Sequence, residues 1–254
     1  MSSSTTWDPA LYLDFDDHRS RPFHDLIARV RTPAPRRVVD LGCGPGHLTS
    51  VLAARWPEAV VEALDSSPEM VAAARAAGVD AREQAVEDWV PRADTDVVVT
   101  NAVLQWVPTH RELITRWIGA LPAGATFAMQ VPGNFGAPSH ALIREIAACW
   151  ETPIGLRTEL AVGEPAEYAD LVTATGAVAD VWETTYMQRL TGEDPVLQWI
   201  RSTALRPVRD ALSEVDYARF LDRLAPRLRE AYPMTADGST WFPFRRIFVV
   251  ATRV

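Results

Sequence analysis

Three glycines at alternate positions have the spacing that most clearly suggests chemistry. Gly42, Gly44 and Gly46 follow Asp40 closely in the chain. Glycine lets the backbone turn sharply and approach a ligand, and the start of a following helix would favour a negative group. Asp65 stands about 20 residues further on, the separation at which an acidic residue binds ribose hydroxyls in nucleotide-binding folds. The pattern predicts a site for a nucleoside cofactor.

The spacing within this loop distinguishes between two kinds of cofactor. It is G-x-G-x-G rather than the G-x-G-x-x-G of dinucleotide-binding proteins. Pro45 also stiffens the part of the loop that would have to wrap around a pyrophosphate. A cofactor with a carboxylate fits this loop better, so an NAD-dependent dehydrogenase is disfavoured.

The loop must be positioned by the elements on either side of it. Residues 36–41 and 60–65 are β-branched apolar runs that predict buried strands, and residues 47–56 have the apolar spacing of a helix with one buried face. Further predicted strands are residues 79–84, 96–101, 126–131, 178–186 and 241–251. Further predicted helices are residues 68–77, 139–150, 165–175, 195–203 and 213–231.

Strands that alternate with helices predict an α/β fold, with a mostly parallel, twisted sheet covered on both faces. The whole chain, residues 1–254, is expected to form one domain. A cofactor-binding core would span about residues 30–131. Helices between the last two strands suggest a lid for the substrate, made from about residues 1–25 and 132–246.

Composition excludes several classes of function. The formal net charge is −8, and the chain contains no lysine, so every basic side chain apart from histidine is arginine. Attraction to nucleic acid or to an anionic membrane is not expected. Cys43 and Cys149 belong to no pair or cluster with metal-ligand spacing. Without a long apolar run or an apolar signal region, the protein is predicted to be cytoplasmic.

The cofactor motif resembles that of the class I S-adenosylmethionine-dependent methyltransferases. The match covers residues 40–46, Asp65 and the segment Glu87, Asp88 and Trp89 after the third strand. The resemblance implies a Rossmann-like fold whose last strand is antiparallel. It also implies that residues 40–46 hold the methionine end of the cofactor, that Asp65 holds the ribose, and that Asp88 and Trp89 hold the adenine.

Other residues complete the predicted cofactor site. A carboxylate at Asp88 can accept a hydrogen bond from the adenine amino group, although a helix-capping acid is an alternative interpretation. Residues 101–106 follow the fourth strand, at the sheet edge where ligands bind. The predicted cofactor contacts are Asp40, Gly42, Gly44, Gly46, Asp65, Ser66, Met70, Glu87, Asp88, Trp89, Asn101, Leu104 and Gln105.

The resemblance extends over almost the whole chain and narrows to the trans-aconitate methyltransferase family. It rests on residues 7–9, 101–108, 133–135, 138–140, 184–186, 236–240 and 242–246 together with Tyr12, Phe15, Arg19, Arg21 and Pro22. It implies catalytic roles for Trp106, His140 and Tyr186, with Trp106 facing the reacting methyl group. It also implies substrate contacts by Tyr12, Arg21, Asn134, Arg206, Arg245 and Arg246.

The candidate arginines suit a small polycarboxylic acid, because a guanidinium group binds a carboxylate through two parallel hydrogen bonds. Arg206 is predicted to lie at a helix end near Pro207, and in a strand only one of Arg245 and Arg246 can point to a given face. A solvated surface position or an ion pair is the alternative for each arginine. For His140 the alternative is a capping or core histidine.

Methylation of a carboxylate needs no general base, because the acid is already ionised at pH 7. The predicted reaction therefore depends on alignment of the acceptor oxygen with the departing sulfur. Alternatives are another small carboxylic acid, a natural-product hydroxyl as acceptor, or a cofactor-sensing module without turnover. No metal is predicted, and we expect a monomer or a weak homodimer.

Overall fold

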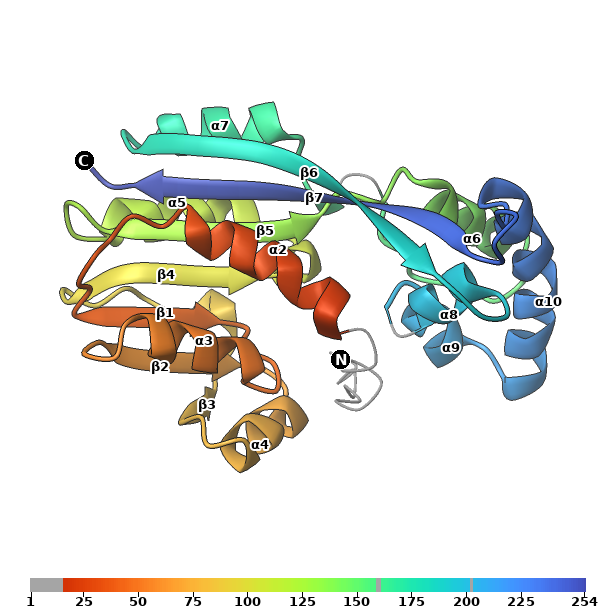
Figure 1. Cartoon of the computed structure of the whole chain (residues 1–254), viewed down its shortest axis with the longest axis horizontal. Helices are drawn as coiled ribbons and strands as arrows, with labels where there is room; N and C mark the ends of the chain where they lie inside the picture. The colour runs from red at the N-terminus through yellow and green to blue at the C-terminus, as the bar shows by residue number, and fades with distance from the viewer. Residues whose placement is uncertain (1–15, 159–160, 202) are drawn as a thin grey trace. The chain divides into compact units, whose positions relative to one another are not determined.

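The computed structural model describes residues 16–158, 161–201 and 203–254. A seven-stranded sheet has the order β3-β2-β1-β4-β5-β7-β6. β1 pairs in parallel with β2 and β4, and further parallel pairs join β2 to β3 and β4 to β5. The arrowheads in Figure 1 show that β7 runs opposite to its neighbour β5, as the resemblance implies. The strands are β1 (Arg37–Leu41), β2 (Val60–Asp65), β3 (Ala81–Glu83), β4 (Thr95–Asn101), β5 (Thr126–Pro132), β6 (Val178–Leu190) and β7 (Thr240–Thr252).

Helices connect the strands, with α2 and α3 in front of the sheet in Figure 1 and α5 behind it. Two short 3-10 helices, η1 (Val86–Asp88) and η2 (Leu104–Trp106), follow β3 and β4. The α-helices are α2 (Asp16–Ala28), α3 (His47–Arg55), α4 (Pro68–Ala76), α5 (His110–Ala120), α6 (Pro138–Ala148), α7 (Pro165–Thr173), α8 (Pro195–Arg201), α9 (Arg206–Ala211) and α10 (Glu214–Ala231).

The apolar runs of the central strands become the core. Val38, Val39 and the three valines of β4 are fully buried, as expected for parallel strands covered on both faces. The register pairs Leu41 with Leu64. This pairing brings the residue after β1, Gly42, next to the end of β2 at Asp65, so the sheet places the two parts of the predicted cofactor motif side by side.

The chain divides into two compact units. The first consists of the described residues up to Val131 together with Gly163–Glu183 and Ile247–Val254. The second consists of Pro132–Val162 and Thr184–Arg246, and in it α10 packs against α6, α8 and α9. Both β6 and β7 contribute residues to each unit.

Five features of the chain differ from the prediction. Helices α2, α5 and α9 were not predicted. The sequence of α5 carries a clear signal, since its buried residues Leu113, Ile114, Trp117 and Ile118 have helical spacing. β6 continues to Leu190, so the expectation that its strand ends at Tyr186 was wrong. The expectation that Arg206 ends a helix was also wrong, because Arg206 begins α9 and Pro207 occupies the first turn, where its missing N–H is tolerated.

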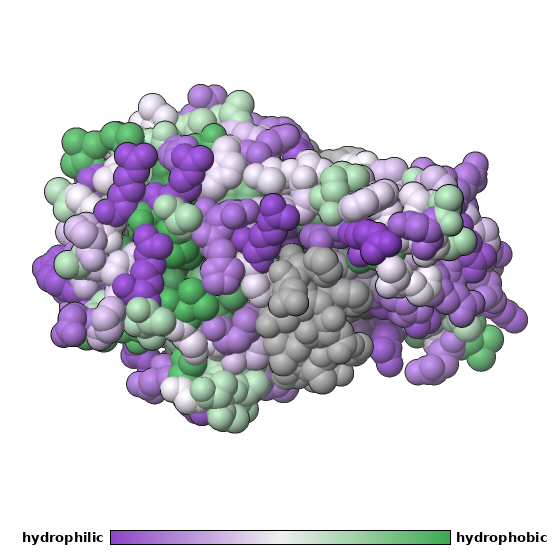
Figure 2. All heavy atoms as spheres, viewed as in Figure 1, coloured by the Kyte–Doolittle hydropathy of each residue, from purple (hydrophilic) through white to green (hydrophobic). Residues whose placement is uncertain are grey.

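The surface is mainly hydrophilic on the face drawn in Figure 2. Large exposed hydrophobic side chains come from distant parts of the chain, including Val60, Val178, Val215 and Met234. Among the residues that the structure describes, no helix is both long and apolar enough to cross a membrane.

Candidate functional site

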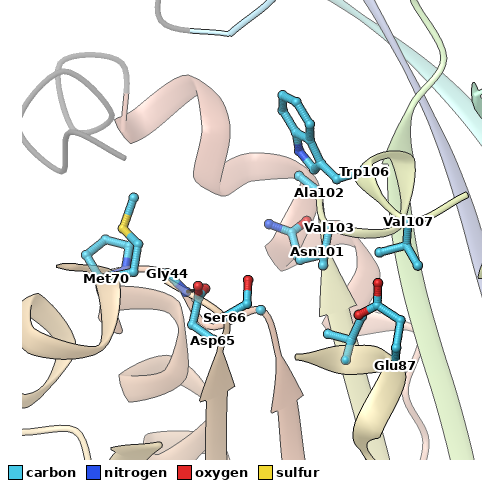
Figure 3. Close-up of a pocket in the computed structure, with 13 residues that line it drawn as sticks. Gly44, Asp65, Ser66, Met70, Glu87, Asn101, Ala102, Val103, Trp106 and Val107 are labelled. Atoms are coloured by element: carbon cyan, nitrogen blue, oxygen red, sulfur yellow. Dashed lines mark hydrogen bonds between the residues drawn. The ribbon is translucent and has the colours of Figure 1, made fainter. Parts of the chain in front are cut away.

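A cavity of about 230 Å³ lies in the first unit, where β1, β2 and β4 end (Figure 3). It is at the carboxyl edge of parallel strands, where α/β folds bind ligands. Eight of the predicted site residues line it. The full lining is Gly42, Gly44, Pro45, Asp65, Ser66, Met70, Val86, Glu87, Asn101, Ala102, Val103, Trp106 and Val107.

The glycine loop has the conformation that its composition predicts. The φ angles of Gly42, Gly44 and Gly46 are 80°, 55° and 86°, a region that other residues rarely enter. A β-carbon on Gly42 would lie 2.2 Å from a methyl carbon of Val103, whereas one on Gly44 would meet no atom within 4 Å. Gly42 is therefore required for packing within the protein, and Gly44 leaves open space in the cavity wall.

Asp65 holds the loop and lines the cavity at the same time. One carboxylate oxygen accepts a hydrogen bond from the Gly44 N–H at 2.9 Å, and the other accepts one from the Ser67 N–H at 2.9 Å. Burial raises the pKa of Asp65, and the hydrogen bonds from Ser67 and Gly44 oppose this shift. Figure 3 shows the carboxylate next to Gly44 and Ser66. It is thus fixed in orientation and retains lone pairs for a ligand hydroxyl.

The opposite side of the cavity is a strained turn after β4. Ala102 has a φ of 57°, and its N–H donates to the carbonyl of Gln130 at 2.9 Å. The side-chain amide of Gln105 donates to the Ala102 carbonyl at 2.6 Å. Asn101 Oδ1 is a buried acceptor without a donor among the described residues. An acceptor of this kind at the cavity suits a ligand with N–H or O–H groups, such as the ammonium and ribose of S-adenosylmethionine.

Some predicted cofactor residues do not line the cavity. Trp89 is 3% exposed and packs edge to face on Trp117, with ring centroids 5.7 Å apart. Gln105 holds the turn at Ala102. The predicted residues outside the lining are Asp40, Gly46, Asp88, Trp89, Leu104 and Gln105. Direct contact with the cofactor stays a prediction for these residues and for those that line the cavity.

Asp40 is a buried carboxylate inside the motif, only 3% exposed. Its partner is the hydroxyl of Thr49 on α3, which donates to Asp40 Oδ2 at 2.6 Å. Burial raises the pKa of Asp40 to about 6, and the charge of Asp65 adds to the shift. An ionised Asp40 therefore destabilises the folded state relative to a protonated one.

Replacing Asp40 with Asn should change how stability depends on pH. The folded pKa is raised above the unfolded value of about 3.9, so between pH 4 and 6 the folded wild type binds more protons and becomes less stable as pH rises. An asparagine side chain does not titrate in this range. The free energy of unfolding of Asp40→Asn minus that of the wild type should therefore increase by about 2–3 kcal/mol from pH 4 to pH 7. Urea unfolding at several pH values measures this difference. Parallel pH profiles for the two proteins would contradict this prediction. Thr49→Val removes the hydrogen bond to the ionised form of Asp40, so in this variant the free energy of unfolding should fall more steeply as pH rises.

A buried network that the sequence did not suggest supports the cavity at Val107. The Val107 carbonyl can only accept, so the His110 Nδ1 that lies 2.9 Å from it carries the proton. His110 Nε2 then accepts from the Tyr168 hydroxyl at 3.0 Å, and that hydroxyl accepts from the Gly163 N–H at 3.1 Å. Burial lowers the pKa of His110, which matches a neutral imidazole. The network holds the backbone at Val107, the residue that follows Trp106.

The second unit contains His140, in the first turn of α6. Its Nδ1 lies 3.1 Å from the Ser139 hydroxyl, and its ring packs edge-on against Phe135. Burial lowers the pKa of His140 to about 4, and the charges of Arg157 and Arg144 add to the shift. The imidazole is therefore neutral at pH 7, so it can hydrogen-bond to a carboxylate but adds no positive charge.

Asn134 is fixed to β7 in the same unit. Its Oδ1 accepts from the Arg245 N–H at 2.7 Å, and the Gly133 N–H donates to the Arg245 carbonyl at 2.9 Å. The side chain of Arg246 is 6% exposed with its guanidinium carbon 4.4 Å from the Phe244 ring centroid, whereas Arg245 is half-buried. Successive arginines thus differ in burial, as alternation in a strand requires.

The remaining predicted residues are spread over both units. Tyr186 is 3% exposed in the second-unit part of β6, and Arg206 is half-buried at the start of α9. Arg21 is exposed on α2 in the first unit, and Tyr12 lies outside the described residues. Among the residues that could be searched, no group of histidine, cysteine, aspartate and glutamate could hold a metal ion.

Sequence reasoning missed two residues of the cavity wall. Ala102 and Val103 belong to the predicted segment 101–106, but Val86 and Val107 also line the cavity and carry no polar group that would have attracted attention. Their signal is position alone, because each follows a strand that ends at the carboxyl edge of the sheet.

Comparison with solved structures finds chains of similar fold. The YcgJ protein of Bacillus subtilis has a TM-score of 0.60 at 15% identity, covering 93% of this chain and 98% of that one. A geranyl diphosphate methyltransferase solved in complex with SAM has a TM-score of 0.54 at 17% identity, covering 96% and 89%.

Sequence comparison gives the family. The methyltransferase domain family matches residues 15–153. The trans-aconitate 2-methyltransferase of Rhodococcus jostii (strain RHA1) is 60% identical over 250 residues, covering 96% of this chain and 98% of that protein. The protein of the same name from Mycobacterium tuberculosis (strain ATCC 25177 / H37Ra) is 55% identical and covers 96% of each chain. This chain therefore belongs to the S-adenosylmethionine-dependent methyltransferases, within the trans-aconitate 2-methyltransferase family.

Proposed function

We propose that this protein transfers the methyl group of S-adenosylmethionine to a carboxylate of trans-aconitate, releasing a monomethyl ester and S-adenosylhomocysteine. The observation that carries the proposal is the 60% identity to a trans-aconitate 2-methyltransferase over nearly the full length of both chains.

The first unit offers the groups that this cofactor needs. S-adenosylmethionine supplies a methyl carbon activated by a positively charged sulfur. Asp65, fixed by Gly44 and Ser67, would accept from the ribose hydroxyls. Asn101 Oδ1 is the buried acceptor available for a donor of the cofactor. The carboxylates of Asp65 and Glu87 also line the cavity and favour a cationic sulfonium.

The chemistry needs positioning rather than proton transfer. A carboxylate nucleophile is ionised at neutral pH, so no side chain has to act as a general base. This fits the neutral state of His140, whose low pKa makes it a poor proton acceptor at pH 7. We propose that Trp106 faces the reacting methyl group, and that Tyr186 and His140 orient the acid. Alignment and exclusion of water could contribute several kcal/mol.

Methyl transfer from labelled cofactor to a panel of di- and tricarboxylic acids and natural-product phenols tests the proposal. Trans-aconitate should have the highest kcat/KM. At saturating substrates, turnover should change less than about threefold between pH 6.5 and 8.5, because the nucleophile titrates well below that window. A steep single-proton rise near neutrality, or preference for a phenol, would contradict carboxylate methylation.

A further inference from the structure

Two arginines that the sequence did not single out, Arg144 and Arg157, lie in the second unit. Arg157, in the segment between α6 and α7, places its guanidinium carbon 5.4 Å from the centre of the Phe135 ring. Phe135 is itself 4% exposed. Such a cation–π contact helps to fix the position of a guanidinium group. Arg157 is thus held in place by an apolar partner.

A narrow cavity adjoins this arginine. Its volume is about 20 Å³, enough for roughly one water-sized group. The cavity therefore has room for about one oxygen atom of a carboxylate and not for a whole tricarboxylic acid. Polar and apolar walls meet there, since the lining is Phe135, His140, Ile143, Arg144, Leu156, Arg157, Ala204 and Pro207.

Positive charge is concentrated around this cavity. Burial lowers the pKa of Arg157 to about 10, and the charge of Arg206 adds to the shift. The charges of Arg157 and Arg144 also help to keep His140 neutral. Three guanidinium groups in one region of a protein with a net charge of −8 favour an anionic ligand, whose binding would relieve their mutual repulsion.

The neighbouring groups are held rigidly. Arg144 donates to the Phe135 carbonyl at 2.6 Å, and Ser139 donates its N–H to the Tyr232 hydroxyl at 3.0 Å. Because Asn134 Oδ1 accepts from the Arg245 N–H, the orientation of the Asn134 amide is fixed. Its Nδ2 is then a buried donor with no acceptor among the described residues. A donor of this kind next to Phe135 in the chain also suits a ligand rich in acceptor oxygens.

We propose that Arg157, with Arg206 beside it, binds a carboxylate of the substrate that does not react, and that Arg157 determines the preference for tricarboxylic over dicarboxylic acids. This inference rests on the proposed function. In this proposal Arg157 is a specificity-determining residue, because the carboxylate that it binds takes no part in bond formation.

The test compares Arg157→Gln and Arg157→Lys with a matched control. Arg223 of the same unit also stacks its guanidinium on an aromatic ring, at 5.0 Å from Trp150, but is exposed on α10. Arg223→Gln therefore removes a similar cation–π contact away from the narrow cavity. Arg206→Gln provides a second variant in case Arg157→Gln does not fold. Thermal unfolding and calorimetric binding of S-adenosylmethionine verify the fold and the cofactor site of each variant.

Kinetics with four acids separate a change in substrate specificity from a general loss of activity. Trans-aconitate has three carboxylates, while glutaconate, mesaconate and itaconate each lack a different one of them. Arg157→Gln should lower kcat/KM for trans-aconitate by about tenfold to a thousandfold, mainly through KM. With the dicarboxylate that lacks the group bound by Arg157, wild type and Arg157→Gln should differ by less than threefold. Arg157→Lys should recover part of the loss, and Arg223→Gln should retain wild-type values.

Two results would overturn the assignment of Arg157. One is a wild-type kcat/KM for trans-aconitate in folded Arg157→Gln and Arg206→Gln. The other is an equal loss of kcat/KM with all four acids. If the wild-type protein methylates none of the acids although it binds the cofactor, the proposed function fails together with this inference, and that outcome is distinct from the first two.

Discussion

Gly44→Val is expected to abolish measurable binding of S-adenosylmethionine, a loss of at least about a hundredfold in affinity, or about 2.8 kcal/mol. Gly44 lines the cavity with a φ of 55°, and a β-carbon there would point into space that no protein atom fills. A branched side chain would therefore occupy the volume that the cofactor needs. Titration calorimetry with S-adenosylmethionine and S-adenosylhomocysteine measures the loss.

Gly124→Val is the matched control for backbone strain. Gly124 has a φ of 83° and open space around its β-carbon position, as Gly44 does. It precedes β5, at the opposite edge of the sheet from the cavity. Both variants should lose roughly 1–2 kcal/mol of stability from the strained φ, but Gly124→Val should bind the cofactor normally. Normal binding by Gly44→Val would remove the glycine loop from the cofactor site.

Gly42→Ala should have the largest effect on stability, lowering the free energy of unfolding by about 3 kcal/mol. Its β-carbon would lie 2.2 Å from Val103 Cγ2, so Val103 or the loop must move. Overpacking costs about 1–3 kcal/mol, and the φ of 80° adds roughly 1–2 kcal/mol for a residue other than glycine. Urea unfolding at pH 7 measures the difference. Because Val103 lines the cavity, cofactor affinity should also decrease.

Val103→Ala provides a rescue test for this packing. It removes both methyl carbons that a β-carbon at residue 42 would approach most closely, so that the nearest remaining atom is the Val103 Cβ at 3.1 Å. In the Gly42→Ala/Val103→Ala double variant the overpacking cost should mostly disappear, giving an interaction free energy of about 1–2 kcal/mol in the double-mutant cycle. Additive losses would mean that the strained φ, and not contact with Val103, limits residue 42.

The cavity of the first unit was predictable because its sequence signals are local. A β-branched run that stops at glycine sets the end of β1, and Asp65 sets the end of β2. Parallel pairing then brings these ends together. The roles within the motif were less predictable. The position of Asp40 in the motif predicts a contact with the cofactor. In the fold its carboxylate accepts a hydrogen bond from Thr49, a partner that only the packing of α3 on β1 reveals.

The second unit was harder to predict, because its contacts join residues far apart in the chain. Arg157 stands in a segment without helical or strand periodicity, and in a chain without lysine a single arginine carries little information. Only the fold brings it to Phe135 and to the charge of Arg206. α9 was missed for a local reason, since Pro207 was taken to end a helix and instead belongs to the first turn of one.

The two cysteines have opposite environments, and this makes the protein suitable for selective labelling at one site. Cys43 is buried in the glycine loop, where burial raises the pKa of its thiol. A thiol that does not ionise reacts slowly with maleimides and oxidants. Cys149 is exposed at the end of α6, in the second unit. A fluorophore or spin label can therefore be attached to the native sequence on the helix whose first turn contains Ser139 and His140, leaving the cofactor loop unmodified.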